Sequence, residues 1–392
     1  MTSRERVRAI IGRGAAAPGG AVEPDRPGFW MGNPHDDSWP ALEEAFAGGV
    51  PHPDAVATAS RDHETRDGHR ERSGDEAHAL PPHLATKGIA SDEAARRRAV
   101  RRRLGDDFVW ISPEWTAYRH PEGRPIFEIG RKGDSLNAPG VFAETESAQE
   151  VDDFPWPNPD YLDFDECLAE LRAAGPVYRA SGFWSPFFHI VADFFGMDNY
   201  FVKMYADPDV VHAVTRHVVD FYLEANRRFY AVAGDLVDGY FFGNDFGTQL
   251  DLLISPDSFR EFVFPYFREL TEQGHEYGQQ VILHSCGSIY KVIPDLLSLG
   301  VDALHPLQAR AANMEAERLG SEFGGAVAFV GGVDTQDLLV NGTPEEVEAD
   351  VRRVATALGP YVVISPSHEA LLPNVPPANV LAMARAVGSV ER

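Results

Sequence analysis

The stretch Gln280-Val281-Ile282-Leu283-His284-Ser285-Cys286-Gly287 decides how the chain is interpreted, because an apolar run ends in two residues that bind metals. The run has the length and composition of a buried strand. His284 and Cys286 are two residues apart, so at the end of a strand both side chains point to one side and can reach one ion. Zinc accepts this mixture of imidazole and thiolate. The alternative is a core histidine beside a buried cysteine, since both are common inside proteins.

Five further apolar runs resemble this strand, and stretches with helical patterns separate them. The six expected strands span residues 177–182, 236–242, 280–284, 301–305, 327–332 and 361–365. Two more are expected, over 27–31 and within 108–129. Strands that alternate with helices are typical of a parallel sheet. Eight such units favour an α/β fold of the closed (β/α)8 type, a TIM barrel. An open doubly wound sheet is the alternative, but no Gly-x-Gly-x-x-Gly turn follows the first strand.

Start signals predict several helices. Asp207-Pro208 opens a long helix to about Ala233, with Asp207 as the cap and Pro208 in the first turn. Ser255-Pro256 and Thr343-Pro344 open two more in the same way. A short basic helix is expected over 4–13, before a flexible connector over 14–20.

A polar segment interrupts this pattern near residues 51–103, where Arg, His, Asp and Glu crowd together and aromatic residues are scarce. Such a composition indicates a solvated excursion, with loops and one helix near 92–104. The chain is therefore expected to be one barrel domain over 1–392, with an N-terminal extension and this excursion.

The composition narrows the class of protein. Hydrophobic residues make up 44% of the 392 residues, which is ample for the core of a globular enzyme. The net charge of −25 disfavours nonspecific binding to nucleic acid or anionic membranes. The apolar runs are too short to span a bilayer, and no apolar signal segment follows the first residues. Two isolated cysteines, Cys167 and Cys286, form no disulfide framework and suit a reducing compartment, so a cytoplasmic location is expected.

Polar residues follow nearly every expected strand. In a barrel, catalytic groups lie where strands end and the following loops begin. These strand-end residues are Asn33 and His35, Trp184, Asn244 and Asp245, His284 and Cys286, His305, Asp334, and His368 with Glu369.

A third zinc ligand is expected from the loop after the last strand, where His368 follows Pro366-Ser367. Two histidines, one cysteine and an open position would be a catalytic arrangement, because structural zinc sites are usually closed by four protein ligands. Glu369 would serve as an exchangeable fourth ligand or as a proton acceptor. The alternative for His368 is a loop histidine that caps the next helix.

Asp245 is the candidate acid, base or orienting group. It would position a substrate together with Asn244, support a zinc-bound histidine, or transfer a proton. Gly243 and Gly247 flank it and allow the backbone to approach a ligand closely. Turn formation or helix capping is the alternative role. Trp30 would line the floor of the pocket or simply pack inside the barrel.

Several stretches of the second half together carry a family resemblance. They are Asn244-Asp245-Phe246-Gly247-Thr248-Gln249, Ile254-Ser255-Pro256, His284-Ser285-Cys286-Gly287-Ser288, Pro294-Asp295-Leu296, Gly331-Gly332-Val333-Asp334-Thr335-Gln336 and Val375-Pro376-Pro377-Ala378-Asn379-Val380. With them, the chain from about Asp235 onward resembles the uroporphyrinogen decarboxylase superfamily. That superfamily includes zinc-dependent methyltransferases that act with corrinoid proteins or coenzyme M. The resemblance implies a (β/α)8 barrel.

The resemblance also implies a choice of chemistry. The decarboxylases carry an arginine-rich segment after the first strand, whereas this chain has Trp30-Met31-Gly32-Asn33-Pro34-His35, without arginine. A substrate with eight carboxylates needs several cations, so the segment disfavours a porphyrin substrate. The methyltransferases bind zinc through a His-x-Cys pair and a later cysteine. His284 and Cys286 match the pair, and His368 takes the place of the later cysteine.

We therefore expect a zinc-dependent methyltransferase or demethylase that acts on a small substrate with a separate corrinoid protein. Zinc would be held by His284, Cys286 and His368, with Asp245 and Glu369 as catalytic groups. The expected substrate-binding residues are Trp30, Asn33, His35, Asn244, Gln249, His305 and Asp334. A metal-independent decarboxylase and a non-catalytic ligand-binding barrel are the alternatives. A homodimer is left open as a further partner.

Overall fold

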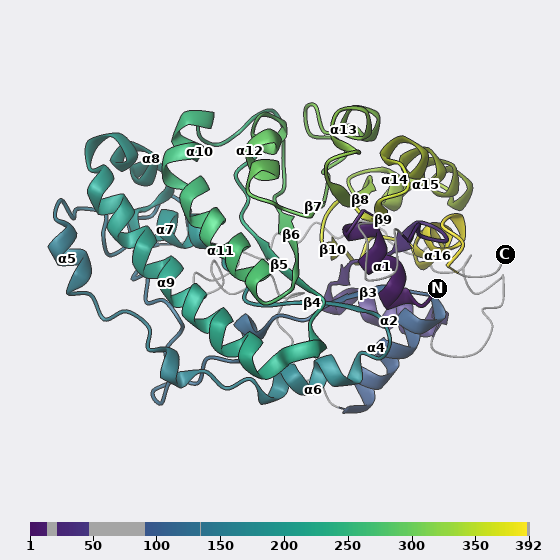
Figure 1. The fold of residues 1–392 in the computed structure, drawn as a ribbon, viewed down its shortest axis with the longest axis horizontal. Helices are drawn as coiled ribbons and strands as arrows, with labels where there is room; N and C mark the ends of the chain where they lie inside the picture. The colour runs from purple at the N-terminus through teal and green to yellow at the C-terminus, as the bar shows by residue number, and fades with distance from the viewer. Residues whose placement is uncertain (14–21, 47–90, 134, 390–392) are drawn as a thin grey trace.

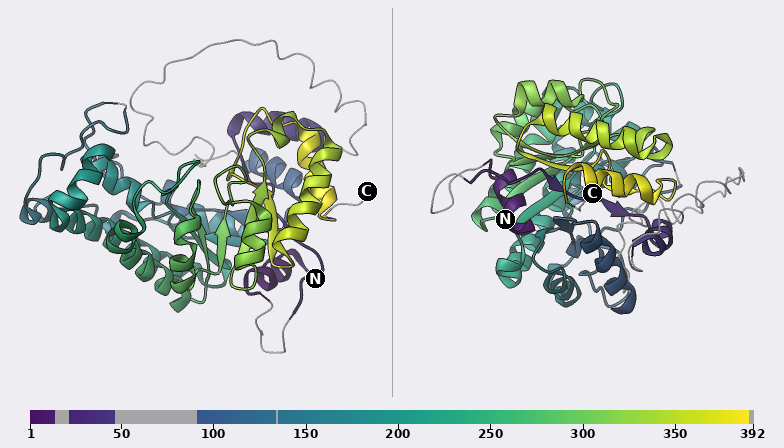
Figure 2. Two further views of the ribbon diagram at one scale, coloured as in Figure 1. Left: turned by 90° about the horizontal axis from the view of Figure 1, so that it is seen from above. Right: turned by 90° about the vertical axis from the view of Figure 1, so that its right-hand side faces the viewer.

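Eight parallel strands form one sheet in the order β1-β9-β8-β7-β6-β5-β4-β3, and helices surround it (Figures 1 and 2). The computed structural model describes residues 1–13, 22–46, 91–133 and 135–389. The strands are β1 (Gly28–Phe29), β3 (Phe108–Trp110), β4 (Tyr178–Ser181), β5 (Gly239–Gly243), β6 (Gln280–His284), β7 (Ala303–His305), β8 (Ala328–Val333) and β9 (Val362–Pro366). The sheet curls into a nearly closed barrel, which confirms the predicted (β/α)8 fold.

Asp107 joins the two edge strands of this barrel. Its backbone N–H donates to the carbonyl of Phe29 at 2.8 Å, and its carboxylate accepts from the Phe29 N–H at 3.0 Å. The same carboxylate binds Arg6 at 2.7 Å, from the N-terminal helix α1 (Ser3–Ile11). Helix α1 packs against the barrel strands and adds Val7 and Ile10 to the apolar interior. The predicted N-terminal helix is thus confirmed, and it forms part of the barrel.

The remaining helices lie outside the strands or follow the polar excursion. Those before the fifth strand are α2 (Trp39–Phe46), α4 (Ser91–Arg103), α5 (Ala148–Asp152), α6 (Asp165–Ala173), α7 (Phe187–Phe195), α8 (Met197–Ala206) and α9 (Pro208–Ala233). Those after it are α10 (Pro256–Phe262), α11 (Phe264–Glu276), α12 (Ile293–Ser298), α13 (Ala316–Phe323), α14 (Leu338–Asn341), α15 (Pro344–Leu358) and α16 (Pro377–Ala386). No helix in the described ranges is both long enough and apolar enough to cross a membrane.

Two of the three predicted helix caps are confirmed. Thr343 forms a capping box with Glu346, and the Ser255 side chain accepts from the Ser258 N–H. Asp207 does not cap α9, which corrects the prediction. Its carboxylate instead accepts from Lys203 Nζ at 2.9 Å, so the side chain is drawn back toward α8.

The strand boundaries differ from the predictions by a few residues. The strand expected over 236–242 begins at Gly239, because residues Gly234–Leu236 form a 3-10 turn. The strand expected over 301–305 begins at Ala303. The helix expected near 92–104 is α4. The expected loops between 51 and 90 and the connector over 14–20 lie outside the described residues.

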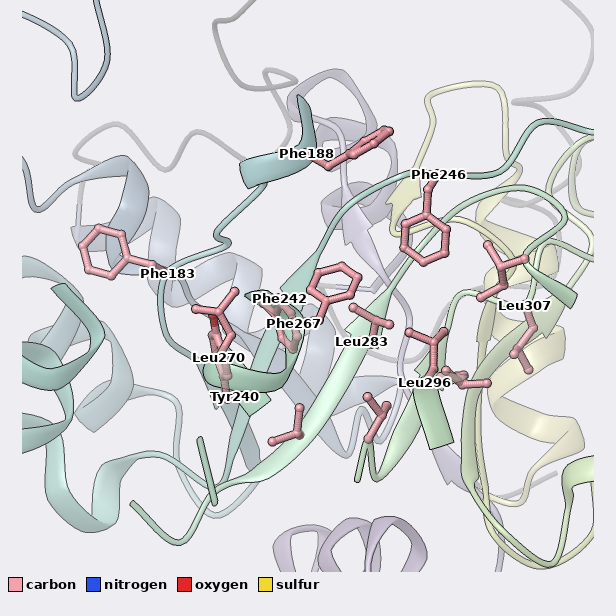
Figure 3. Close-up of a cluster of buried hydrophobic side chains, with 14 of the residues drawn as sticks. Phe183, Phe188, Tyr240, Phe242, Phe246, Phe267, Leu270, Leu283, Leu296 and Leu307 are labelled. Carbon is pink, nitrogen blue, oxygen red and sulfur yellow. The ribbon is translucent and has the colours of Figure 1, made fainter. Parts of the chain in front are cut away.

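Strand β6 is buried on both faces, which explains its continuous apolar run. Ile282 belongs to the cluster inside the barrel, whereas Val281 and Leu283 belong to the layer between strands and helices. Figure 3 shows part of that outer layer, where Leu283 lies near Phe267. Because side chains alternate along a strand, His284 shares the inward direction of Ile282. The strand therefore directs His284 into the mouth of the barrel.

Candidate metal centre

His284 and Cys286 meet at the end of β6. The His284 side chain is 3% exposed, and its Nε2 atom lies 3.5 Å from the Sγ atom of Cys286. The register places His284 between Gly243 of β5 and His305 of β7. A Cβ on Gly243 would approach the Cβ of His284 to 2.7 Å, so only glycine leaves room for this side chain.

Asp245 reaches the pair from the loop after β5. Its Oδ1 atom accepts from the Cys286 N–H at 2.7 Å and lies 3.1 Å from His284 Nε2. The loops after β5 and β6 can approach because Gly287 has a φ of +82° and because a Cβ on Gly247 would be 2.8 Å from the Cys286 carbonyl. Burial raises the pKa of Asp245, but the hydrogen bond and charge of His284 outweigh it and lower that pKa to about 2. Asp245 is therefore an ionised carboxylate.

His305 lies behind His284, deeper in the barrel. The two Nδ1 atoms are 2.8 Å apart. The His305 ring is 1% exposed and packs against the rings of Trp30 and Phe241, with centroids 5.2 and 5.0 Å away. Burial, reinforced by His284, lowers the pKa of His305 well below its ordinary value. His305 is thus a neutral side chain with one polar neighbour.

His368 and Glu369 approach from the loop between β9 and the short strand β10 (Ala370–Leu371), which pairs with β2 (Asn33–Pro34). The Glu369 side chain is 9% exposed, and its Oε2 atom lies 3.8 Å from His284 Nε2. The His368 side chain is 41% exposed. Its Nδ1 atom accepts from the Ala370 N–H at 3.0 Å, which leaves Nε2 for another ligand.

Two groups of ligand atoms result, and the thiol of Cys286 belongs to both. Ligand atoms of Asp245, His284 and Cys286 lie within 4.8 Å of one another, as do those of Cys286, His368 and Glu369. All five side chains come from the C-terminal ends of strands or the loops that follow them. The sequence placed them at the strand ends, and the structure brings them together.

Comparison with known proteins places the chain in a family. A model of the uroporphyrinogen decarboxylase (URO-D) family matches residues 174–390, more than half of the chain. The chain belongs to the uroporphyrinogen decarboxylase family. The matched range covers all five side chains of the two groups. Strands β1 and β3 lie before it, and they complete the barrel.

Two relatives illustrate the range of this family. The methylated-thiol–coenzyme M methyltransferase of Methanosarcina mazei is 26% identical over 160 residues, which are 41% of this chain and 40% of that protein. The chain thus matches less than half the length of that relative. The solved structure of a methyltransferase from Methanosarcina mazei superposes with a TM-score of 0.60 at 16% identity, over 98% of each chain. The second likeness supports the shared fold alone.

Three of the predicted substrate-binding residues are held by hydrogen bonds within the chain. The Asn244 amide is buried; its Oδ1 accepts from the Phe188 N–H at 2.7 Å, and its Nδ2 donates to the Ser185 carbonyl at 3.1 Å. Asn33 donates its N–H to the Glu369 carbonyl at 2.7 Å, and His35 Nδ1 accepts from a neighbouring N–H. Asn244 is therefore committed to the loop before α7, whereas Asn33 holds the backbone of the Glu369 loop.

The other predicted substrate-binding residues lie in different surroundings. Trp30 is fully buried in the barrel interior, beneath His305 rather than at an open surface. Gln249 is exposed in the turn after β5, where its carbonyl accepts from the Ala312 N–H. Asp334 is ion-paired with Arg310 at 2.7 Å. It lines a separate open cavity of about 490 Å³, which none of the five candidate metal-binding residues lines.

Two residues near the site were not singled out from the sequence. His189, on α7, accepts the Asp245 N–H at its Nε2 atom at 3.1 Å. Glu114 accepts from the Ser185 N–H at 3.0 Å, and burial raises its pKa to about 7. The loop that both support carries Trp184, whose ring centroid is 5.0 Å from that of His284. The Ser-Pro pair at 185–186, just after an expected strand, is the sequence signal that could have pointed to this loop.

Proposed function

We propose that this member of the uroporphyrinogen decarboxylase family is a zinc-dependent methyltransferase or demethylase. It acts on a small substrate, together with a separate corrinoid protein. The observation that carries the proposal is the gathering of one thiol, two imidazoles and two carboxylates at the mouth of the barrel. The printed activity of the Methanosarcina relative, a methyltransferase for methylated thiols, supports the same class of reaction.

The side chains present fit a divalent cation. Burial, together with the nearby carboxylates of Asp245 and Glu369, raises the pKa of the Cys286 thiol well above its ordinary value. A cation would offset this local negative charge and favour the thiolate, which is the form that binds metals. Thiolate and imidazole ligands favour zinc over magnesium or calcium, which prefer oxygen ligands. We assign the ligands as His284, Cys286 and His368, with a carboxylate as an exchangeable fourth.

Zinc bound there would supply Lewis-acid chemistry to the thiol, hydroxyl or ether oxygen of a substrate. The chain itself orients the ligands, because Asp245 fixes the Cys286 backbone and lies beside His284 Nε2. Glu369 would accept the proton that a substrate thiol or hydroxyl loses, and would return it in the reverse reaction. Trp184 packs against His284 and would restrict water on that side.

The metal content of the purified protein tests the proposal, and the second cysteine of the chain provides a matched control. We expect wild type and Cys167→Ala to hold about one zinc ion per chain, and Cys286→Ala to lose it. Cys167 is buried in α6, outside both groups of ligand atoms. Clearly substoichiometric zinc in both wild type and Cys167→Ala would refute the proposal.

Decarboxylation of a porphyrinogen is the second candidate, because the matched family is named for that reaction. The segment after β1, Trp30 to His35, has no arginine. Arg101 reaches it through the Gly32 carbonyl, but its guanidinium is ion-paired with Asp106 at 2.6 Å. Incubation of metal-free protein with uroporphyrinogen separates the two functions. Product formation without metal would reverse our ranking.

A further inference from the structure

The buried pair of His284 and His305 shares a single proton. The two residues are direct partners in the register of β6 and β7, and their Nδ1 atoms are 2.8 Å apart. In such a contact between neutral imidazoles, one Nδ1 donates its N–H and the other accepts with its lone pair. The location of this proton fixes the tautomer of both rings.

The tautomer of His284 determines whether it can bind a metal. Its Nε2 atom is the one that faces the site, 3.5 Å from Cys286 Sγ and 3.1 Å from Asp245 Oδ1. When Nε2 carries the proton, it donates to Asp245 and has no lone pair for an ion. When Nδ1 carries the proton, Nε2 is free to ligate, and Nδ1 needs an acceptor.

His305 is placed to be that acceptor. Its ring is buried among aromatic side chains, with Trp30 and Phe241 on either side of the contact with His284. Its Nε2 atom is buried and has no hydrogen-bond partner among the described residues. The bond to His284 is thus the one polar contact that the structure gives the His305 side chain. A buried polar group with so little compensation is costly for folding, so packing alone does not explain a histidine here.

We propose that His305 is a positioning residue that accepts the Nδ1–H of His284 and so holds the tautomer whose Nε2 binds zinc. The proposal rests on the zinc site of the proposed function and adds a specific role for His305, which the sequence had suggested as a substrate contact. It follows the general rule that a metal-binding histidine donates its other ring N–H to a fixed acceptor. A neutral imidazole takes the place of the more usual carboxylate or carbonyl.

Zinc affinity of the full-length protein, measured by competition with a chelator, tests the assignment. His305→Phe keeps a ring of similar size and removes the acceptor, so we expect zinc to bind 10- to 100-fold more weakly. His305→Asn places an amide oxygen near the position of Nδ1, and we expect it to restore affinity to within about threefold of wild type. The control is His212→Phe on α9, where His212 Nδ1 contacts the Tyr266 hydroxyl at 3.0 Å, and we expect no change.

The outcomes separate this inference from the zinc site itself. His305→Phe with wild-type affinity, or His305→Asn as weak as His305→Phe, would overturn the positioning role and leave the proposed function standing. A wild-type protein that binds no zinc would overturn both. Thermal unfolding of each variant identifies a misfolded protein. If His305→Phe does not fold, His305→Asn against His305→Ala decides, since only the amide can accept from His284.

Discussion

The two sides of the candidate metal centre differ in how firmly their side chains are held. On the β5–β6 side, the buried His284 lies between His305 and Asp245, and the Cys286 backbone is bonded to Asp245. On the β9 side, the His368 side chain is 41% exposed and makes its printed hydrogen bond to the backbone of its own loop. The β5–β6 side is built in advance, whereas the β9 side can adjust to what binds.

Backbone packing accounts for much of this difference. Gly247 and Gly287 let the loops after β5 and β6 touch, and the Gln308 side chain accepts from the Gly287 N–H at 2.7 Å. The loop of His368 is tied down by the two-residue pairing of β10 with β2. Catalytic zinc sites need both properties, because a rigid set of ligands must leave one position open to the substrate.

The largest expected effect is on the β5–β6 side. His284→Ala removes a preformed ligand, and we expect zinc to bind on the order of 1,000-fold more weakly, about 4 kcal/mol, since a zinc site shares roughly 10–16 kcal/mol among its ligands. Chelator competition measures this loss. His275→Ala is a control, because its ion pair with Asp302 lies outside both ligand groups. A loss no greater than that of His368→Ala would abolish the distinction between the two sides.

The rigid side was also the more predictable from the sequence. A run that is apolar on both faces of a strand fixes β6, and the two-residue spacing places His284 and Cys286 on one side of it. The loop after β5 ends next to them because neighbouring parallel strands end at the same edge, which brings Asp245 to the site. Local patterns therefore sufficed wherever the contact follows from strand order.

Contacts between distant segments were beyond such patterns. Asn244 looked like a substrate ligand at a strand end, but its amide is bonded to backbone atoms at Ser185 and Phe188, more than 50 residues earlier. His189 was not singled out, because nothing in a helix pattern reveals that its ring meets Asp245. Asp207 has the residue type of a cap, and the competing Lys203 decides its conformation. In each case the outcome depends on a partner that is chosen by the tertiary fold.

The second prediction concerns the loop that backs the β5–β6 side. Glu114 accepts from the Ser185 N–H and the Tyr222 hydroxyl, and this loop carries Trp184 against His284. Burial raises the pKa of Glu114 from 4.5 to about 7 in the folded protein. The folded state therefore binds the proton more tightly than the unfolded state, so this group's contribution to stability is largest at low pH and declines as the pH rises to about 7.

Glu114→Gln should remove this decline, because the amide mimics the protonated acid and can still accept from Ser185 while donating to Tyr222. Between pH 5 and pH 8, we expect the free energy of unfolding of wild type to fall by about 2–3 kcal/mol more than that of the variant. Urea unfolding at the two pH values measures the difference. The pKa values of Asp106 and Glu170 are also raised to about 7, and both residues remain in the variant. Equal slopes for the two proteins would show that Glu114 does not stabilise the loop in this way.

The smallest expected effect is on the β9 side. His368→Ala removes a ligand that is exposed and must be ordered when it binds, so we expect only about a tenfold loss in zinc affinity, or roughly 1.4 kcal/mol. His368→Cys should bind zinc at least as tightly as wild type, because a thiolate brings a negative charge to the ion. Chelator competition on both variants, beside His284→Ala, ranks the two sides directly. No loss in His368→Ala would leave Asp245 or Glu369 as the third ligand, since their carboxylates already lie within 4.8 Å of the thiol group atoms they accompany.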